Sequence, residues 1–304
     1  MSDIATPKIR RPLLGDGILA QALRGILGSK AATLAAIACL ALVAVAILAP
    51  WIAPQDPYDL ASLSIMDGRL PPGSESMDGW TYWLGTDAQG RDMLSAMLYG
   101  LRTSLGVGVL SGVFALAVGT TLGLVAAYFG GKIDTLVMRV VDLMLGFPTI
   151  LVALMMLAVL GQGVGKVILA LVVVQWAYFA RAVRAAALVE RGKEYVEAAQ
   201  CLGLSKARIL FSHLLPNCLP PVIVIGTIQV AHAIAAEATL SFLGIGLPIT
   251  EPSLGLLIAN GYQVLLAGLY WISVFPGLLL LALIFSINIV GDRLREALNP
   301  RLQK

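Results

Sequence analysis

The feature that most constrains the fold of this chain is a series of long apolar stretches with few or no charged residues. The first covers residues 31–52 and has no charged side chain, and as an α-helix it would be about 33 Å long. The hydrocarbon layer of a bilayer is about 30 Å thick, so a helix of this length crosses it. Hydrophobic residues make up 58% of the 304 residues, more than a soluble domain carries. The sequence therefore predicts an integral membrane protein.

Six such stretches predict an all-α, polytopic protein with six transmembrane helices. They cover residues 31–52, 101–129, 135–160, 167–187, 221–243 and 271–290. Pro148 is predicted to bend the third span, and Arg139 and Asp142, one turn apart near its start, are predicted to pair. Glycines along the second span predict close packing against a neighbouring helix, because in lipid small residues let two helices approach.

The distribution of basic residues predicts the orientation in the membrane. With a cytoplasmic N-terminus, all but four of the 21 lysines and arginines lie on the cytoplasmic side. The four exceptions are Arg69, Arg91, Arg102 and Lys166. Because basic residues collect on the cytoplasmic side of membrane proteins, both termini and the loop at 190–216 are predicted to be cytoplasmic.

This orientation divides the chain into four regions. Residues 1–30 form a basic cytoplasmic tail with a helix predicted over 18–27, and a tail of this length favours a retained span over a cleaved signal peptide. Residues 31–100 hold the first span and an extracytoplasmic segment in which acidic residues predominate. Residues 101–291 are the transmembrane core, and 292–304 are a cytoplasmic tail.

The polar island at 190–216 is predicted to fold as two short helices. Four apolar residues at helical spacing give the first helix one narrow apolar face. They are Tyr195, Ala198, Ala199 and Leu202. Gly203 predicts a left-handed turn that ends this helix. Ser205 is predicted to cap a second helix over 206–215, which Pro216 ends.

The spacing of residues in this island resembles the "EAA" loop of bacterial ABC importer permeases, which docks on a cytoplasmic ATPase. The matching residues are Glu197, Ala198, Ala199, Gly203, Leu215 and Pro216. The residue pattern by itself places Glu197 on the polar side of the helix. There it can reach a cationic group while the apolar face fills a groove. The resemblance implies that these six residues form the coupling helix.

A second motif, in the extracytoplasmic segment, resembles the dipeptide, oligopeptide and nickel branch of these permeases. It reads LGTDAQGRDMLS over residues 84–95. Four apolar residues at its end share one face and predict a short helix over 91–100 at the membrane surface. They are Met93, Leu94, Met97 and Leu98. The chain end around 291–301 resembles the same branch.

Three polar residues lie inside the apolar run of the fifth span. Gln229, His232 and Glu237 fall within an arc of about 140° and are therefore predicted to face protein or water rather than lipid. We consider them candidates for the translocation pathway or its gate. For Glu237 the competing interpretation is a hydrogen-bonded strut between helices.

The chain carries no motif for nucleotide hydrolysis or other catalysis, and GQGVGK at 161–166 lacks the spacing of a phosphate-binding loop. The three cysteines and two histidines show no ligand spacing, so neither a metal nor a cofactor is predicted. Nothing in the sequence indicates nucleic-acid binding. A secondary transporter that uses Glu237 for ion coupling is the alternative from another class.

The resemblance implies a type I importer permease in a bacterial inner membrane that provides half of a peptide pathway. It also implies a second homologous permease, two cytoplasmic ATP-binding subunits and an extracytoplasmic solute-binding protein. Nickel complexes, glutathione and other small solutes are the alternative cargoes.

Overall fold

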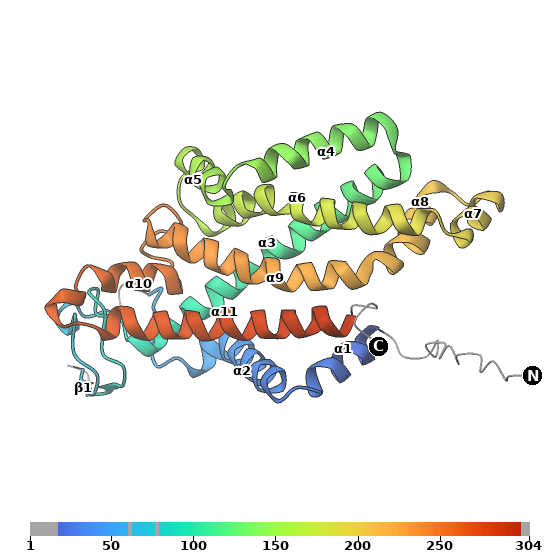
Figure 1. Cartoon of the computed structure of the whole chain (residues 1–304). Helices are drawn as coiled ribbons and strands as arrows, with labels where there is room; N and C mark the ends of the chain where they lie inside the picture. The colour runs from blue at the N-terminus through green and yellow to red at the C-terminus, as the bar shows by residue number, and fades with distance from the viewer. Residues whose placement is uncertain (1–17, 60–62, 77–78, 299–304) are drawn as a thin grey trace, which may run out of the picture.

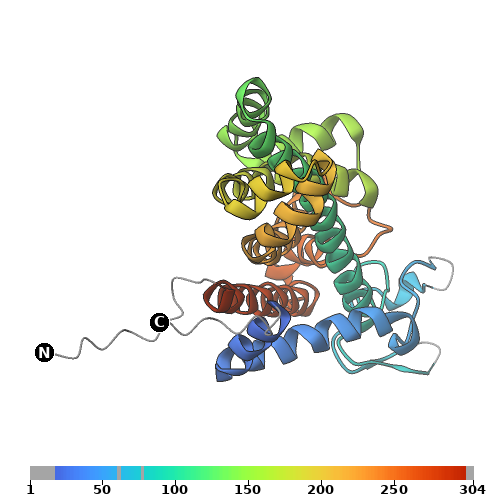
Figure 2. The same ribbon diagram turned by 90° about the vertical axis from the view of Figure 1, so that its right-hand side faces the viewer.

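The computed structural model, which describes residues 18–59, 63–76 and 79–298, is an elongated bundle of helices (Figures 1 and 2). Among these residues, five helical segments are long and apolar enough to cross a membrane. They are α2 (Lys30–Ile52), α3 (Met93–Phe129), α6 (Val164–Arg191), Lys206–Phe242 and α11 (Trp271–Leu298). Many leucines, valines and phenylalanines on their outer faces are exposed, as expected where lipid is the solvent.

The remaining candidate span, which is the third along the chain, is a broken pair of helices. They are α4 (Gly131–Gly146) and α5 (Thr149–Leu160), and they meet at an angle of 90°. The predicted bend before Pro148 is therefore a full break. α4 packs along α6, where Arg184 makes two bonds to Asp134, of 2.5 and 2.6 Å. The predicted pairing of Asp142 with Arg139 is wrong, because Asp142 accepts a 2.6 Å bond from Arg181 of α6 instead.

The closest helix packing joins α3 to α6, as the glycines of the second span predict. A Cβ atom at Gly119 would lie 2.3 Å from the carbonyl oxygen of Trp176, and one at Gly123 would lie 2.6 Å from that of Ala180. No side chain fits at either position, so the two backbones touch.

α3 begins earlier than predicted. Asp92 caps it by accepting a 2.7 Å bond from the backbone N–H of Ser95, and the helix then runs without a break to Phe129. The predicted surface helix over 91–100 is its first part. Met93 and Met97 are buried there against α10 (Leu254–Tyr262) and α11, so this face contacts protein and not lipid.

The segment between α2 and α3 is held together by the residues of the 84–95 motif. It contains η2 (Ile65–Asp67) and a small antiparallel pair, β1 (Ser74–Glu75) and β2 (Thr81–Tyr82). Asp87 and Arg91 form a buried ion pair of 2.6 Å, and Arg91 also donates to the carbonyl oxygen of Ile249. Trp271 at the start of α11 donates to the carbonyl oxygen of Thr86. The motif therefore fastens this segment to the end of the bundle.

The two ends of the bundle differ. Figure 1 shows α1 (Ile18–Leu27), the C-terminal end of α11 and α7 (Glu194–Cys201) at one end. At the opposite end lie the β pair, α10 and η4 (Leu265–Ala267). α1 packs on α11, where Arg293 donates to the carbonyl oxygen of Gly25. The predicted helix over 18–27 is confirmed.

Candidate functional site

The first candidate site is α7, the helix of the central loop. Glu194 and Glu197 lie in its first turn, where acidic side chains complement the positive end of the helix dipole. Gly203 has a φ of +70°, as predicted. Its N–H donates to Gln200 and the N–H of Leu204 donates to Ala199. This pair of bonds is the Schellman arrangement, which satisfies carbonyls at a helix end.

The inner face of α7 anchors it to the rest of the chain. Val196 and Ala199 are 0% and 3% exposed and pack against Leu124 of α3 and Leu214 in a common apolar cluster. The position of α7 is therefore fixed by packing against two transmembrane segments.

Tyr195 adds a polar tie at the same place. Its hydroxyl donates a 2.9 Å bond to Glu190 at the end of α6 and accepts one from Asn217 near the start of α9 (Leu215–Phe242). Burial and the bond to Glu190 raise the pKa of Tyr195 to about 12, so the phenol remains protonated and able to donate at neutral pH. α7 is thus linked to both helices that flank it.

The outer face of α7 consists of exposed residues of mixed character. They are Glu194, Glu197, Ala198, Gln200, Cys201 and Leu202. The predicted apolar face is wrong in part, because Ala199 and most of Tyr195 face inward while Ala198 and Leu202 face outward. Leu202 is 78% exposed, which leaves a large apolar side chain uncovered at the end of α7.

The prediction that Pro216 ends a helix is also wrong. Ser205 caps α8 (Lys206–Arg208) as predicted, but the chain continues through a π-helical segment, η3 (Ile209–Leu214), into α9. Pro216 directly follows this wide turn, in the first turn of α9, and the helical segment continues past it. Asn217 donates a 2.8 Å bond to the carbonyl oxygen of His213 in this wide turn. The second helix of the central loop and the fifth span are therefore one helical segment, Lys206–Phe242.

The second candidate site lies inside the bundle. Gln229 and His232 line a small cavity between α5, α6 and α9, together with Gln175 and Tyr178 of α6. Gln229 is buried and His232 is exposed. Sequence reasoning missed Gln175, although it interrupts the apolar run of the fourth span just as Gln229 interrupts that of the fifth.

Glu237 does not join this cavity. It is 0% exposed, and its carboxylate accepts 2.8 Å bonds from Ser104 of α3 and Ser241 of α9. Ser104 also accepts a 3.4 Å bond from the N–H of Leu254 at the start of α10. Glu237 thus lies where three helices meet, on another side of α9 from His232.

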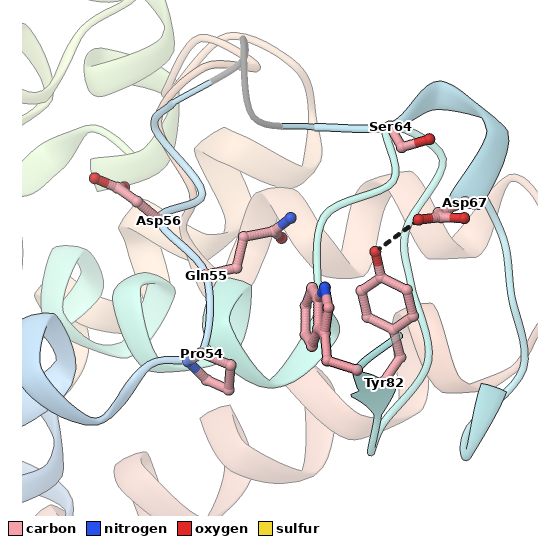
Figure 3. A pocket seen from close by; sticks show the side chains of 7 residues that line it. Pro54, Gln55, Asp56, Ser64, Asp67 and Tyr82 are labelled. Carbon is pink, nitrogen blue, oxygen red and sulfur yellow. Dashed lines mark hydrogen bonds between the residues drawn. The ribbon is translucent and has the colours of Figure 1, made fainter. Parts of the chain in front are cut away.

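The third candidate site is a recess in the segment between α2 and α3, drawn in Figure 3. It has a volume of about 280 Å³ and lies between the end of α2 and the β pair. Asp67 accepts 3.1 Å bonds from Tyr82 and Ser76, and the ring of Trp80 lies 4.3 Å from that of Tyr82. Burial raises the pKa of Tyr82, which keeps its hydroxyl a donor. These contacts hold the segment in shape.

Comparison with known proteins gives a consistent picture. Residues 119–304 match the family described as binding-protein-dependent transport system inner membrane component. Residues 18–72 match the N-terminal transmembrane domain of oligopeptide transport permease C.

Two relatives and one solved structure illustrate the similarity. The dipeptide transport system permease protein DppC of Haemophilus influenzae is 37% identical over 260 residues, 86% of this chain and 87% of that protein. The glutathione transport system permease protein GsiD of Pectobacterium atrosepticum is 34% identical over 280 residues, 92% and 90% of the two chains. An inward-facing MetNI methionine ABC transporter structure aligns with a TM-score of 0.55 at 23% identity, covering 68% of this chain and 98% of that chain. That structure confirms the type I permease fold.

Proposed function

The chain belongs to the family of binding-protein-dependent transport system inner membrane components, and from this premise we propose that it forms half of the translocation pathway of an ATP-driven importer of di- and oligopeptides. A second, homologous permease completes the pathway. An extracytoplasmic binding protein delivers the cargo, and two cytoplasmic ATP-binding subunits hydrolyse the ATP.

The observation that carries this proposal is the construction of α7. Its outer face presents Glu197 and Leu202 to solvent, while its inner face is packed and hydrogen-bonded to the transmembrane helices. A helix built in this way can receive a force on one side and pass it on through the other. The segment that continues from it carries Gln229 and His232, so movement of α7 displaces the candidate pathway.

The same proposal includes an orientation in the membrane, inferred from the end of the bundle that holds α7. α1, α7 and the C-terminal end of α11 lie towards the same end of the bundle (Figure 1), and basic residues stand in or next to these elements. They are Arg24, Lys193, Lys206, Arg208, Arg293 and Arg295. The positive-inside rule supports a cytoplasmic location for this end. The β pair, α10 and the recess of Figure 3 then face the binding protein.

Peptide cargo is supported by the relatives. One is named for dipeptide transport and another for glutathione transport, and both compounds contain peptide or amide bonds with N–H donors. Nickel complexes and other small solutes are the alternatives. Calorimetry of the neighbouring binding protein against a panel of peptides, glutathione and nickel complexes separates them.

The ion-coupled carrier has less support. A coupling carboxylate must exchange ions with water during transport, whereas Glu237 is enclosed and accepts hydrogen bonds from two serines. This environment favours the strut between helices.

Uptake by the complete complex in reconstituted vesicles, with ATP enclosed and the binding protein outside, tests the proposal. We expect dipeptide accumulation that requires ATP and the loaded binding protein, is abolished by vanadate and survives an uncoupler. Accumulation that an uncoupler abolishes and vanadate leaves intact would instead identify a carrier.

A further inference from the structure

The cavity between α5, α6 and α9 contains a buried polar group without a partner. Gln175 is 5% exposed, and its side-chain N–H donates a long bond of 3.4 Å to the carbonyl oxygen of Gln229. Its side-chain oxygen has no donor among the residues that the structure describes. A buried carbonyl oxygen without a donor is costly, so such a group usually has an occupant or a function.

The position of Gln175 makes this absence of a donor more significant. Measured along α6 (Val164–Arg191), it lies about 17 Å from one end and about 24 Å from the other. It is therefore deep in the hydrocarbon layer, where lipid offers no hydrogen bonds. Gln229 is 4% exposed and lines the same cavity, so two neighbouring helices each place a buried amide residue at this depth.

The cavity is small in this state but can be reached. Its volume of about 50 Å³ has room for a few water molecules and none for a peptide. On its outer side stand His232, which is exposed, and Tyr178, which is 39% exposed. α5 forms another wall, and it joins α4 at the 90° break. A shift of α5 or α9 would thus open the cavity beside His232.

We propose that Gln175 contacts the cargo and that its side-chain oxygen accepts a hydrogen bond from an amide N–H of the peptide during translocation. This inference rests on the proposed function and adds to it a residue that selects for the peptide bond. Water fills the cavity between transport cycles. Gln229 and His232 line the same cavity, whereas Glu237 lies elsewhere and does not contact the cargo.

Dipeptides with and without an amide N–H provide the test, because the peptide bond of Ala-Pro has no N–H and that of Ala-Ala has one. The complete importer is reconstituted in vesicles with saturating binding protein that is already loaded with either peptide. We expect wild type to take up Ala-Ala about five- to tenfold faster than Ala-Pro, and Gln175→Leu to bring this ratio close to one. Gln21→Leu, a partly exposed glutamine of α1 at the other end of the bundle, should keep the wild-type ratio.

Equal rates for the two peptides in wild type, or an unchanged ratio in Gln175→Leu, would overturn the inference. The proposed function fails separately, if wild-type vesicles accumulate neither peptide with ATP.

A labelling experiment covers the case in which Gln175→Leu does not assemble. Gln175→Cys is introduced after the native cysteines Cys39, Cys201 and Cys218 are replaced. A membrane-impermeant thiol reagent should label it only while the importer is turning over, and excess Ala-Ala should slow the labelling. Absence of labelling in every state of an active complex would place the cavity outside the pathway and also overturn the inference.

Discussion

Replacing Gly203 tests whether α7 depends on the left-handed turn that ends it. Gly203 has a φ of +70°, and a Cβ atom at this position would meet no other atom within 4 Å. A substitution there therefore causes no collision, and its whole cost is the conformational penalty of a side chain in the left-handed region. That penalty is about 1–2 kcal/mol for most residues and smaller for asparagine.

The structure predicts a graded series. Gly203→Asn should be nearly neutral, Gly203→Ala should cost about 1 kcal/mol, and Gly203→Val about 2 kcal/mol, because branching at Cβ adds to the clash. A cost of about 1.4 kcal/mol is a tenfold change in an equilibrium. The amides of α7, which has eight residues, should thus exchange about 5- to 30-fold faster in the alanine and valine variants.

Hydrogen exchange of the purified complex measures this change, and peptide uptake in vesicles measures its consequence. Uptake should fall in the order of the penalties. Gly192→Ala is the matched control in the same loop, since Gly192 has a φ of −83° and the nearest atom to its Cβ would be 3.9 Å away. Equal effects at both glycines, or a valine variant with normal exchange and uptake, would refute the reasoning.

Four further predictions concern the outer face of α7, the polar contacts between helices and the isolated chain. Glu197→Arg should insert normally but lose uptake and release the ATP-binding subunits in a detergent pull-down, because like charges across an interface cost several kcal/mol; intact co-purification with normal transport would show that the contact is elsewhere. Glu237→Gln accepts from one serine and can donate its N–H to the hydroxyl oxygen of the other, so it should transport normally from pH 6 to 8. Glu237→Leu should lower the melting temperature, and a pH-dependent defect in the glutamine variant would instead assign a role to the charge. Arg184→Ala and Asp134→Ala should each destabilise the purified complex. A double-mutant cycle should give a coupling of about 1 kcal/mol for this partly exposed pair. Additive effects of the two substitutions would mean that the bond contributes nothing to stability. The purified chain alone should neither bind nor hydrolyse ATP in nucleotide-binding and phosphate-release assays, and activity free of contaminants would contradict the division of labour.

Hydropathy could predict most of the fold, because helix length and apolar content decide what crosses a membrane. The first and last spans begin where predicted, at residues 30–31 and 271. The turn at Gly203 was also predictable, since a glycine directly after a helical pattern commonly takes the left-handed conformation that ends a helix.

Other features depend on contacts that a linear pattern does not contain. The rotation of α7 was not predictable, because Val196 and Ala198 are both apolar and only the cluster beneath the helix selects Val196 as the buried residue. Pro216 was misread as a stop because a proline in a first helical turn and one after a last turn look alike in sequence. Gln175 became notable only when the structure showed its unpaired oxygen.

The unbroken length of α3 has a geometric consequence. Its tight contact with α6 at Gly119 and Gly123 lies close to one end, with about 42 Å of helix towards Met93 and about 12 Å towards Phe129. If the contact acts as a fulcrum, any tilt moves the end at Met93 about 3.5 times as far as the end near α7. α3 is thus a lever with unequal arms. A displacement of its short end that is too small to disturb the packing there produces a several-fold larger displacement of its long end.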